Sequence, residues 1–263
     1  MKIIMSPLEM KKEIKKIRNQ NGNIKIGFVP TMGGLHEGHL SLIKKCISEN
    51  DISVVSVFLN PTQFNDKNDL ISYPADKDED IAFLEKAGID FAFMPDYKNM
   101  YPDDYAYKVI ETDFSKKLCG AKRPGHFDGV LSVVMKLFNI VQPDRAYFGE
   151  KDYQQFQLLK GMAETFFMDV ELVGCPIIRE SNGLAVSSRN RKLSPESLKT
   201  APKLYETLIS GHSLRKMAET LESSGFRVDY LTAKSGRLYA AAFLEGVRLI
   251  DNVSYDGEDE NYE

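Results

Sequence analysis

Hydrophobic residues follow two alternating patterns through the first two thirds of the chain. Five short runs are apolar throughout and rich in β-branched or aromatic residues, which is typical of strands buried on both faces. These runs are "IKIGFV", "ISVVSVFL", "IDFAFMP", "RAYF" and "VELVGCPII". Between them, helical spacing of apolar positions occurs in "LSLIKKCISEN", "DKDEDIAFLEKAG", "GVLSVVMKLFNIV" and "YQQFQLLKGMAETFF". This alternation predicts an α/β fold with a Rossmann-like, doubly wound parallel sheet.

The pattern also predicts where the first helix begins. Ser6, Pro7 and Glu9 match the N-cap, first-turn proline and capping-box positions of a helix start. Met10 and Ile14 then begin an apolar stripe at helical spacing.

After Pro176 the pattern changes to that of a smaller α+β unit. "SPESLKTAPKLYETLISG" and "SLRKMAETLESSG" predict one helix each, and "FRVDYLTA", "RLYAAAFLE" and "VRLIDNV" predict strands. We therefore expect two domains, residues 1–175 and 176–263. The tail "YDGEDENYE" is acidic and lacks aliphatic residues, so we expect it to fray.

Composition and charge narrow the class of protein. Hydrophobic residues make up 43% of the 263 residues and charged residues 27%, as in ordinary globular proteins. The net charge of -4 gives no basic field to attract nucleic acid or a membrane surface. The N-terminal apolar stretch is too short for a signal peptide, and no run approaches the roughly 18 apolar residues of a membrane span. The three widely spaced cysteines form no CxxC pair, so we expect a reducing, cytoplasmic environment.

The stretch "PTMGGLHEGHL" carries the strongest chemical signal. A strand, a turn through Gly33 and Gly34, and a helix from about Leu35 would place a helix N-terminus at the carboxyl edge of the sheet. Free backbone N–H groups there favour phosphate, and His36 and His39 could donate hydrogen bonds to phosphate oxygens. Two alternatives remain open: the histidines could simply cap the helix, or they could bind zinc. "HEGH" is one residue shorter than the zinc motif HExxH and has no evident third ligand.

Polar residues also follow the other predicted strands. Asn60 and Gln63 in "FLNPTQF" are neutral amides that could hold a hydroxylated or carboxylated substrate. "GAKRPGHFDGV" forms a cationic loop, and Lys151 in "YFGEKDYQQF" could reach a phosphate at the same sheet edge. In "RESNGLAVSSRN", two serines and Arg189 could clamp a triphosphate. Each segment alone is a weak signal and is also consistent with a polar loop, but their recurrence at successive strand ends indicates a site.

Five motifs in this order make the chain resemble the pantothenate synthetase family, also called pantoate–β-alanine ligases. They are "PTMGGLHEGH", "NPTQF", "KRPGHFDGV", "FGEKDYQQ" and "GLAVSSRN", and the closing "RLIDN" also fits. The resemblance implies ATP-dependent condensation of pantoate with β-alanine to pantothenate, AMP and pyrophosphate, through a pantoyl-adenylate. It also implies a homodimer that uses Mg²⁺, with the small C-terminal domain as a lid.

The resemblance further implies roles for individual positions. Four residues would neutralise charge in catalysis: His36, His39, Lys151 and Arg189. Of these, His39 would also act as a proton donor. ATP would contact Met32, Gly33, Gly34, Leu35, His36, Glu37, Gly38, His39, Gly149, Glu150, Lys151, Asp152, Ile178, Val186, Ser187, Ser188 and Arg189. Asn60, Gln63 and Gln155 would bind pantoate, with Gln63 also near β-alanine. Glu79 and Asp80 would lie near magnesium.

Other activities remain as alternatives. Related HxGH proteins include adenylyltransferases, whose AMP-modified product persists. An aminoacyl-tRNA synthetase relative would need a basic surface and an anticodon-binding domain, which the sequence lacks. A zinc hydrolase and a nucleotide-binding module without turnover belong to other classes, distinguishable by metal content and by the absence of product.

Overall fold

A computed structural model describes residues 1–262 of the chain, which divide into two compact units. Unit 1 comprises Met1–Glu150 and Gln154–Cys175, and unit 2 comprises Lys151–Tyr153 and the residues from Pro176 onward. Within residues 1–262, no helix has the length and hydrophobicity needed to cross a membrane.

Unit 1 contains a six-stranded parallel sheet in the order β1-β4-β3-β2-β5-β6. Its strands are β1 (Lys2–Ile4), β2 (Ile26–Thr31), β3 (Ile52–Val57), β4 (Phe91–Phe93), β5 (Arg145–Gly149) and β6 (Glu171–Cys175). The five predicted strands are thus confirmed. Strand β1 was not predicted, because three residues carry too little pattern; it is placed by its pairing with β4.

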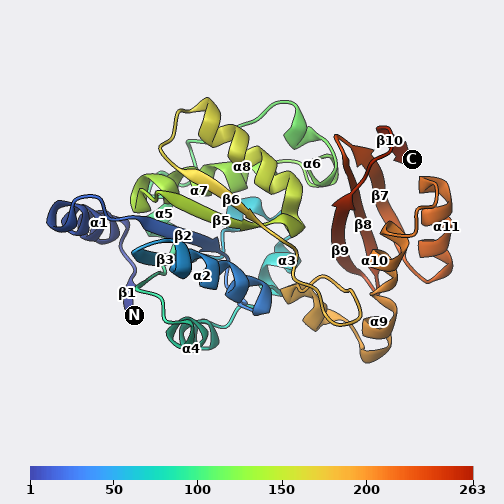
Figure 1. The fold of residues 1–263 in the computed structure, drawn as a ribbon, viewed down its shortest axis with the longest axis horizontal. Helices are drawn as coiled ribbons and strands as arrows, with labels where there is room; N and C mark the ends of the chain where they lie inside the picture. The colour runs from blue at the N-terminus through green and yellow to red at the C-terminus, as the bar shows by residue number, and fades with distance from the viewer. Residues whose placement is uncertain (263) are drawn as a thin grey trace. The chain divides into compact units, whose positions relative to one another are not determined.

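Helices cover both faces of this sheet. They are α1 (Pro7–Asn21), α2 (Glu37–Glu49), α3 (Lys67–Ile71), α4 (Lys77–Ala87), α5 (Tyr97–Met100), α6 (Cys119–Lys122), α7 (His126–Val141) and α8 (Tyr153–Thr165). Figure 1 shows α7 and α8 on one side of the sheet and α2 and α4 on the other. The prediction of a doubly wound fold is confirmed, and so is the N-cap of α1, where Ser6 accepts a hydrogen bond from the Glu9 backbone N–H.

The core of unit 1 consists of the apolar strands packed against these helices. Val29 and Val55 pack with Leu42, Ile43 and other side chains on the α2 and α4 face. Three short 3-10 helices lie in the loops between these strands and helices: η1 (Pro61–Gln63), η2 (Phe114–Lys116) and η3 (Glu150–Asp152).

Unit 2 is built on an antiparallel sheet in the order β10-β7-β8-β9. The strands are β7 (Arg227–Lys234), β8 (Arg237–Leu244), β9 (Val247–Ser254) and β10 (Glu260–Tyr262), and the helices are α9 (Pro195–Thr200), α10 (Lys203–Leu208) and α11 (Leu214–Ser223), preceded by η4 (Ser188–Lys192). Their buried side chains form one cluster that includes Leu204, Met217, Leu231 and Leu238. The α+β class predicted for this region is confirmed.

Two predictions for unit 2 were wrong. The segment expected to form one helix is two helices, α9 and α10, because Pro202 has no N–H to continue the hydrogen-bond ladder. The acidic tail does not fray over its described part: β10 pairs with β7, and Tyr255 and Tyr262 pack against the core. The tail has no aliphatic residues, but its two tyrosine rings provide the hydrophobic packing that holds it. The last residue, 263, lies outside the described part.

Candidate active site

The order of strands in unit 1 identifies one edge of the sheet as the place for a ligand. The chain runs from β2 toward β3 and β4 on one side and from β5 toward β6 on the other, so the winding reverses between β2 and β5. In open α/β sheets, ligands bind at the carboxyl ends of the strands at such a switch point. Of the segments expected to bind ATP, the one beginning at Met32 follows β2 directly, and the one beginning at Gly149 starts at the last residue of β5.

The turn after β2 is fixed by a buried carboxylate from α4. The two Asp80 oxygens accept hydrogen bonds from the backbone N–H groups of Gly34, at 3.0 Å, and Leu35, at 2.8 Å. Gly33 and Gly34 have φ angles of 86° and 64°, in the left-handed region that favours glycine. A Cβ atom on Gly33 would lie 2.7 Å from Asp80 Oδ2, so a larger residue would displace this carboxylate. Asp80 therefore anchors the glycine turn.

His36 and His39 cap the helix that follows. Helix α2 begins at Glu37, two residues later than expected, because His36 is its N-cap and has an extended backbone with φ -151° and ψ 178°. His36 Nδ1 accepts from the Gly38 N–H at 3.1 Å, and His39 Nδ1 accepts from the His36 N–H at 3.3 Å. The ring centroids are 4.1 Å apart. Because each Nδ1 acts as an acceptor, each neutral ring carries its hydrogen on Nε2. The structure therefore confirms that both histidines cap the helix. The same hydrogen bonds leave Nε2–H of each ring as a donor.

The residues expected near magnesium do not form a ligand set for a metal of their own. Asp80 is only 3% exposed, and both of its oxygens accept backbone N–H groups. Glu79 lies exposed in the first turn of α4. Among residues 1–262, no three or more His, Cys, Asp or Glu side chains are grouped so as to hold a metal. Magnesium binding by Glu79 and Asp80 stays a prediction.

The two amides expected to bind substrate are brought together after β3. Asn60 Nδ2 donates to Gln63 Oε1 at 3.0 Å, and Gln63 Nε2 lies 3.0 Å from the sulfur of Met32, a residue of the glycine turn. The Tyr101 hydroxyl donates to Asn60 Oδ1 at 2.9 Å. Burial raises the pKa of Tyr101 to about 12, so its hydroxyl keeps its proton. Since a thioether is a weak acceptor, a substrate oxygen can replace Met32 as the partner of Gln63.

The loop "KRPGHFDGV" holds the same glutamine from its backbone. His126 Nδ1 lies 2.8 Å from the Gln63 carbonyl oxygen, and Arg123 donates to this oxygen at 3.4 Å and to His126 Nε2 at 3.1 Å. A carbonyl only accepts and a guanidinium only donates, so His126 donates from Nδ1 and accepts at Nε2. Arg123 and His126, from a loop that could have faced a substrate, therefore position Gln63.

In helix α8, two neighbouring glutamines have different environments. Gln154 is buried and bonds to the backbone of Phe114, Lys117 and Cys119, so it secures the segment before α7. Gln155, the residue expected to bind pantoate, is half-buried.

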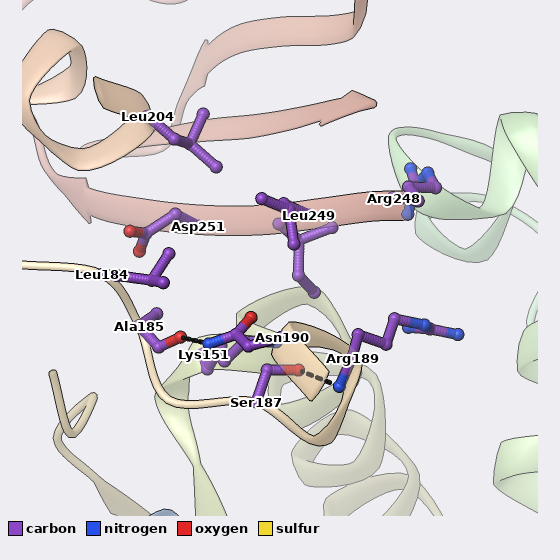
Figure 2. Close-up of a pocket in the computed structure, with 11 residues that line it drawn as sticks. Lys151, Leu184, Ala185, Ser187, Arg189, Asn190, Leu204, Arg248, Leu249 and Asp251 are labelled. Atoms are coloured by element: carbon purple, nitrogen blue, oxygen red, sulfur yellow. Dashed lines mark hydrogen bonds between the residues drawn. The ribbon is translucent and has the colours of Figure 1, made fainter. Parts of the chain in front are cut away.

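The remaining expected ATP contacts lie in unit 2, in and around a small hollow (Figure 2). Its polar lining includes Lys151, Ser187, Arg189 and Asp251. The Arg189 N–H donates to Ser187 Oγ at 3.2 Å, which sets the loop that carries both side chains. This arrangement brings Lys151, Ser187 and Arg189 to one concave surface.

The other expected contacts in this region flank the hollow or lie nearby in the sequence. The Val186 N–H donates to the Ile178 carbonyl, and Ser188 is buried. Ile178 is 37% exposed, and Asp152 is exposed as well.

Sequence reasoning missed three residues that support these groups. Tyr101 holds Asn60, and Asp251 and Asn252 are buried in β9 beside the hollow in unit 2. Only "RLIDN" gave a signal, as part of the family resemblance. Nothing in the local pattern around Tyr101 indicates a contact with a residue 41 positions earlier.

Comparisons with known proteins agree on one family. The model of the pantoate-beta-alanine ligase family matches residues 2–254. The pantothenate synthetase of Bdellovibrio bacteriovorus is 54% identical over 236 residues, covering 90% of this chain and 93% of the relative. That of Coxiella burnetii is 46% identical over 248 residues, covering 94% and 96%.

Solved structures agree with the sequence relatives. The pantoate-beta-alanine ligase of Francisella tularensis, in complex with beta-gamma ATP and beta-alanine, superposes with a TM-score of 0.90 at 39% identity, covering 98% of this chain and 99% of that one. The pantothenate synthetase of Thermus thermophilus gives a TM-score of 0.87 at 40% identity, covering 97% and 100%.

Proposed function

The chain belongs to the pantoate–β-alanine ligase family, and from this premise we propose that it condenses pantoate with β-alanine at the expense of ATP. It is a ligase that forms an amide bond, and its products are pantothenate, AMP and pyrophosphate. One observation supports the assignment of ATP and β-alanine as substrates. The Francisella relative, which has the same fold over 98% of this chain, is complexed with an ATP compound and beta-alanine.

In the first step, a pantoate carboxylate oxygen attacks the α-phosphorus of ATP. A bond forms between them, the bond from that phosphorus to the β-phosphate oxygen breaks, and pyrophosphate leaves with the electron pair. This step needs no protein nucleophile, only in-line positioning and neutralisation of charge. Nε2–H donors on His36 and His39 support this role, as do Lys151 and Arg189 on one concave surface.

Asn60, Gln63 and Gln155 bind pantoate in this proposal. Asn60 and His126 fix the side chain and backbone of Gln63 before substrate arrives, so little ordering remains to be done. Gln63 Nε2 then exchanges the Met32 sulfur for a pantoate oxygen.

In the second step, the neutral amine of β-alanine attacks the acyl carbon of the pantoyl-adenylate. The carbon–nitrogen bond forms, the carbon–oxygen bond to AMP breaks, and the nitrogen loses a proton. Water must be kept out because it would hydrolyse the acyl adenylate. We assign that task to unit 2, acting as a lid over the adenylate.

Three further features belong to the same proposal. Mg²⁺ enters with ATP, held mainly by phosphate oxygens, as is usual for this ion. The enzyme acts in the cytoplasm, in keeping with three free, buried cysteines. It forms a homodimer, as is typical of the family, and light scattering on the purified protein measures this directly.

The test is product formation by the purified protein. With ATP, Mg²⁺, pantoate and β-alanine, mass spectrometry should find pantothenate and AMP in equal amounts over many turnovers. Omitting β-alanine should reduce AMP release to the rate at which the bound adenylate hydrolyses. A lasting AMP-modified product would instead indicate an adenylyltransferase, and ATP binding without any product would indicate a nucleotide-binding module.

A further inference from the structure

The motif "RLIDN" in β9 has no part in the mechanism above, yet it contains two adjacent buried polar residues. Asp251 is 4% exposed and Asn252 is 3% exposed. Burying polar side chains costs free energy unless they are hydrogen-bonded, so their partners indicate what they do. Both have well-defined partners within unit 2.

Asn252 holds the backbone of the residue expected to bind a phosphate. Its Nδ2 donates to the Lys151 carbonyl oxygen at 3.0 Å, and its Oδ1 accepts from Arg237. The Arg237 guanidinium in turn stacks on the Tyr153 ring, 3.6 Å from the centroid. The short segment Lys151–Tyr153 is thus held at its first and last residues by β8 and β9.

Asp251 holds the segment that leads into Ser187–Arg189, the other part of the chain expected to contact phosphate. Its two oxygens accept from both terminal nitrogens of Arg179, at 2.6 and 2.9 Å, a bidentate ion pair with little access to solvent. Arg179 also donates to the Gly183 carbonyl at 3.1 Å and stacks on the Tyr205 ring at 3.7 Å. An isolated bridge pairs Arg179 with Ala185, two residues before Ser187. The segment that leads into Ser187–Arg189 is therefore tied to Asp251.

We propose that Asp251 and Asn252 are positioning residues that set Lys151 and the Ser187–Arg189 loop in register for the triphosphate of ATP. Neither touches the nucleotide in this account. They are consecutive in one strand, so the strand fixes the spacing between the two loops. The inference rests on the proposed function, because that function makes ATP the ligand of these loops.

Asn252→Asp is the substitution that tests this role most specifically. The carboxylate has nearly the same size and keeps an acceptor for Arg237, but it has no hydrogen to donate to the Lys151 carbonyl. A displacement of about 1 Å in a positioning group can cost about a hundredfold in rate. We therefore expect kcat/KM for ATP to fall by about tenfold to a hundredfold, while KM for pantoate changes by less than about twofold.

A double-mutant cycle separates positioning from general damage to the fold. In a Lys151→Ala background, Asn252→Asp should cost less than about twofold further, because Lys151 is the group through which it acts. Asp259→Asn is the matched control. Asp259 accepts from the Ser235 N–H in the same unit, away from the hollow, and its substitution should leave the kinetics unchanged.

Equilibrium binding of a non-hydrolysable ATP analogue gives a readout that does not depend on turnover. Weaker binding to Asn252→Asp than to the unmodified protein or to Asp259→Asn is the result expected. If the unmodified protein bound the analogue but made no product, the proposed function would fail and this comparison would still test the positioning role. A folded Asn252→Asp protein with unchanged analogue affinity and unchanged kcat/KM for ATP would overturn the inference. A full additional loss in the Lys151→Ala background would overturn it as well.

Discussion

Substituting Asp80 tests the most specific structural feature of the site, the buried carboxylate beneath the glycine turn. Asp80→Asn keeps the shape of the side chain but replaces one oxygen with an NH₂ group that faces a backbone N–H. One hydrogen bond to a charged acceptor is lost, and a buried donor is left without a partner. Hydrogen bonds to charged groups contribute about 1.5–3 kcal/mol and an unsatisfied buried donor costs about 1–3 kcal/mol, so we expect a loss of roughly 2.5–6 kcal/mol.

The expected loss can be measured in two ways. For a unit of this size, each kcal/mol lowers Tm by about 2–4 °C, which predicts a decrease of roughly 5–24 °C. The turn also carries the start of helix α2, so a shift of about 1 Å should lower the rate of adenylate formation by about a hundredfold. Calorimetry and a pyrophosphate-release assay measure these two effects on the same protein.

Glu79→Gln is the matched control, because it removes the neighbouring carboxylate from an exposed position. We expect its stability to stay within about 0.5 kcal/mol of the unmodified protein. Asp80→Asn activity should not return when Mg²⁺ is raised. An unchanged Tm for Asp80→Asn, together with activity restored by excess Mg²⁺, would refute the anchoring role and make Asp80 a metal ligand.

Three further predictions follow from the site and the sheet. His39→Ala and Lys151→Ala should each slow adenylate formation by about 10²–10³-fold, with an unchanged far-UV circular dichroism spectrum; near-normal turnover would remove that residue from the mechanism. Tyr101→Phe should lower stability by about 1–3 kcal/mol and raise KM for pantoate more than KM for ATP, because it leaves Asn60 Oδ1 with one fewer donor; equal effects on both KM values would contradict this. Although partial burial opposes ionisation, hydrogen bonds from a backbone N–H and two basic side chains hold the pKa of Asp144 below its ordinary value. Its ionised form therefore stabilises the fold above about pH 4 and this contribution is lost as the pH falls further, so Asp144→Asn should lower Tm at pH 7, and the difference from the unmodified protein should shrink as the pH is lowered below about 4.

Much of the fold could be predicted because buried strands and amphipathic helices leave local patterns. The apolar runs at β2 and β3 and the capping signal at Ser6 needed no knowledge of the rest of the chain. The failures were also physical. Pro202 interrupts a pattern that is otherwise helical, and β10 is held by pairing and by the Tyr262 ring, which no local pattern records.

The sequence predicted the chemical groups of the site but not the side chains that hold those groups in place. Histidine, amide and basic residues at strand ends indicated phosphate and substrate contacts. The side chains that hold them, such as Asp80 beneath Leu35 or Asn252 behind Lys151, lie 45 and 101 positions away. Contacts at such separations depend on the completed fold, so sequence pattern alone does not reveal them.

Pantoate-dependent exchange of labelled pyrophosphate into ATP, with β-alanine left out, tests the central claim most directly. A reversible first step that forms pantoyl-adenylate and pyrophosphate predicts exchange that requires pantoate and Mg²⁺ and needs no β-alanine. Exchange that appears only with β-alanine, or none at all from a protein that makes pantothenate, would contradict the two-step account.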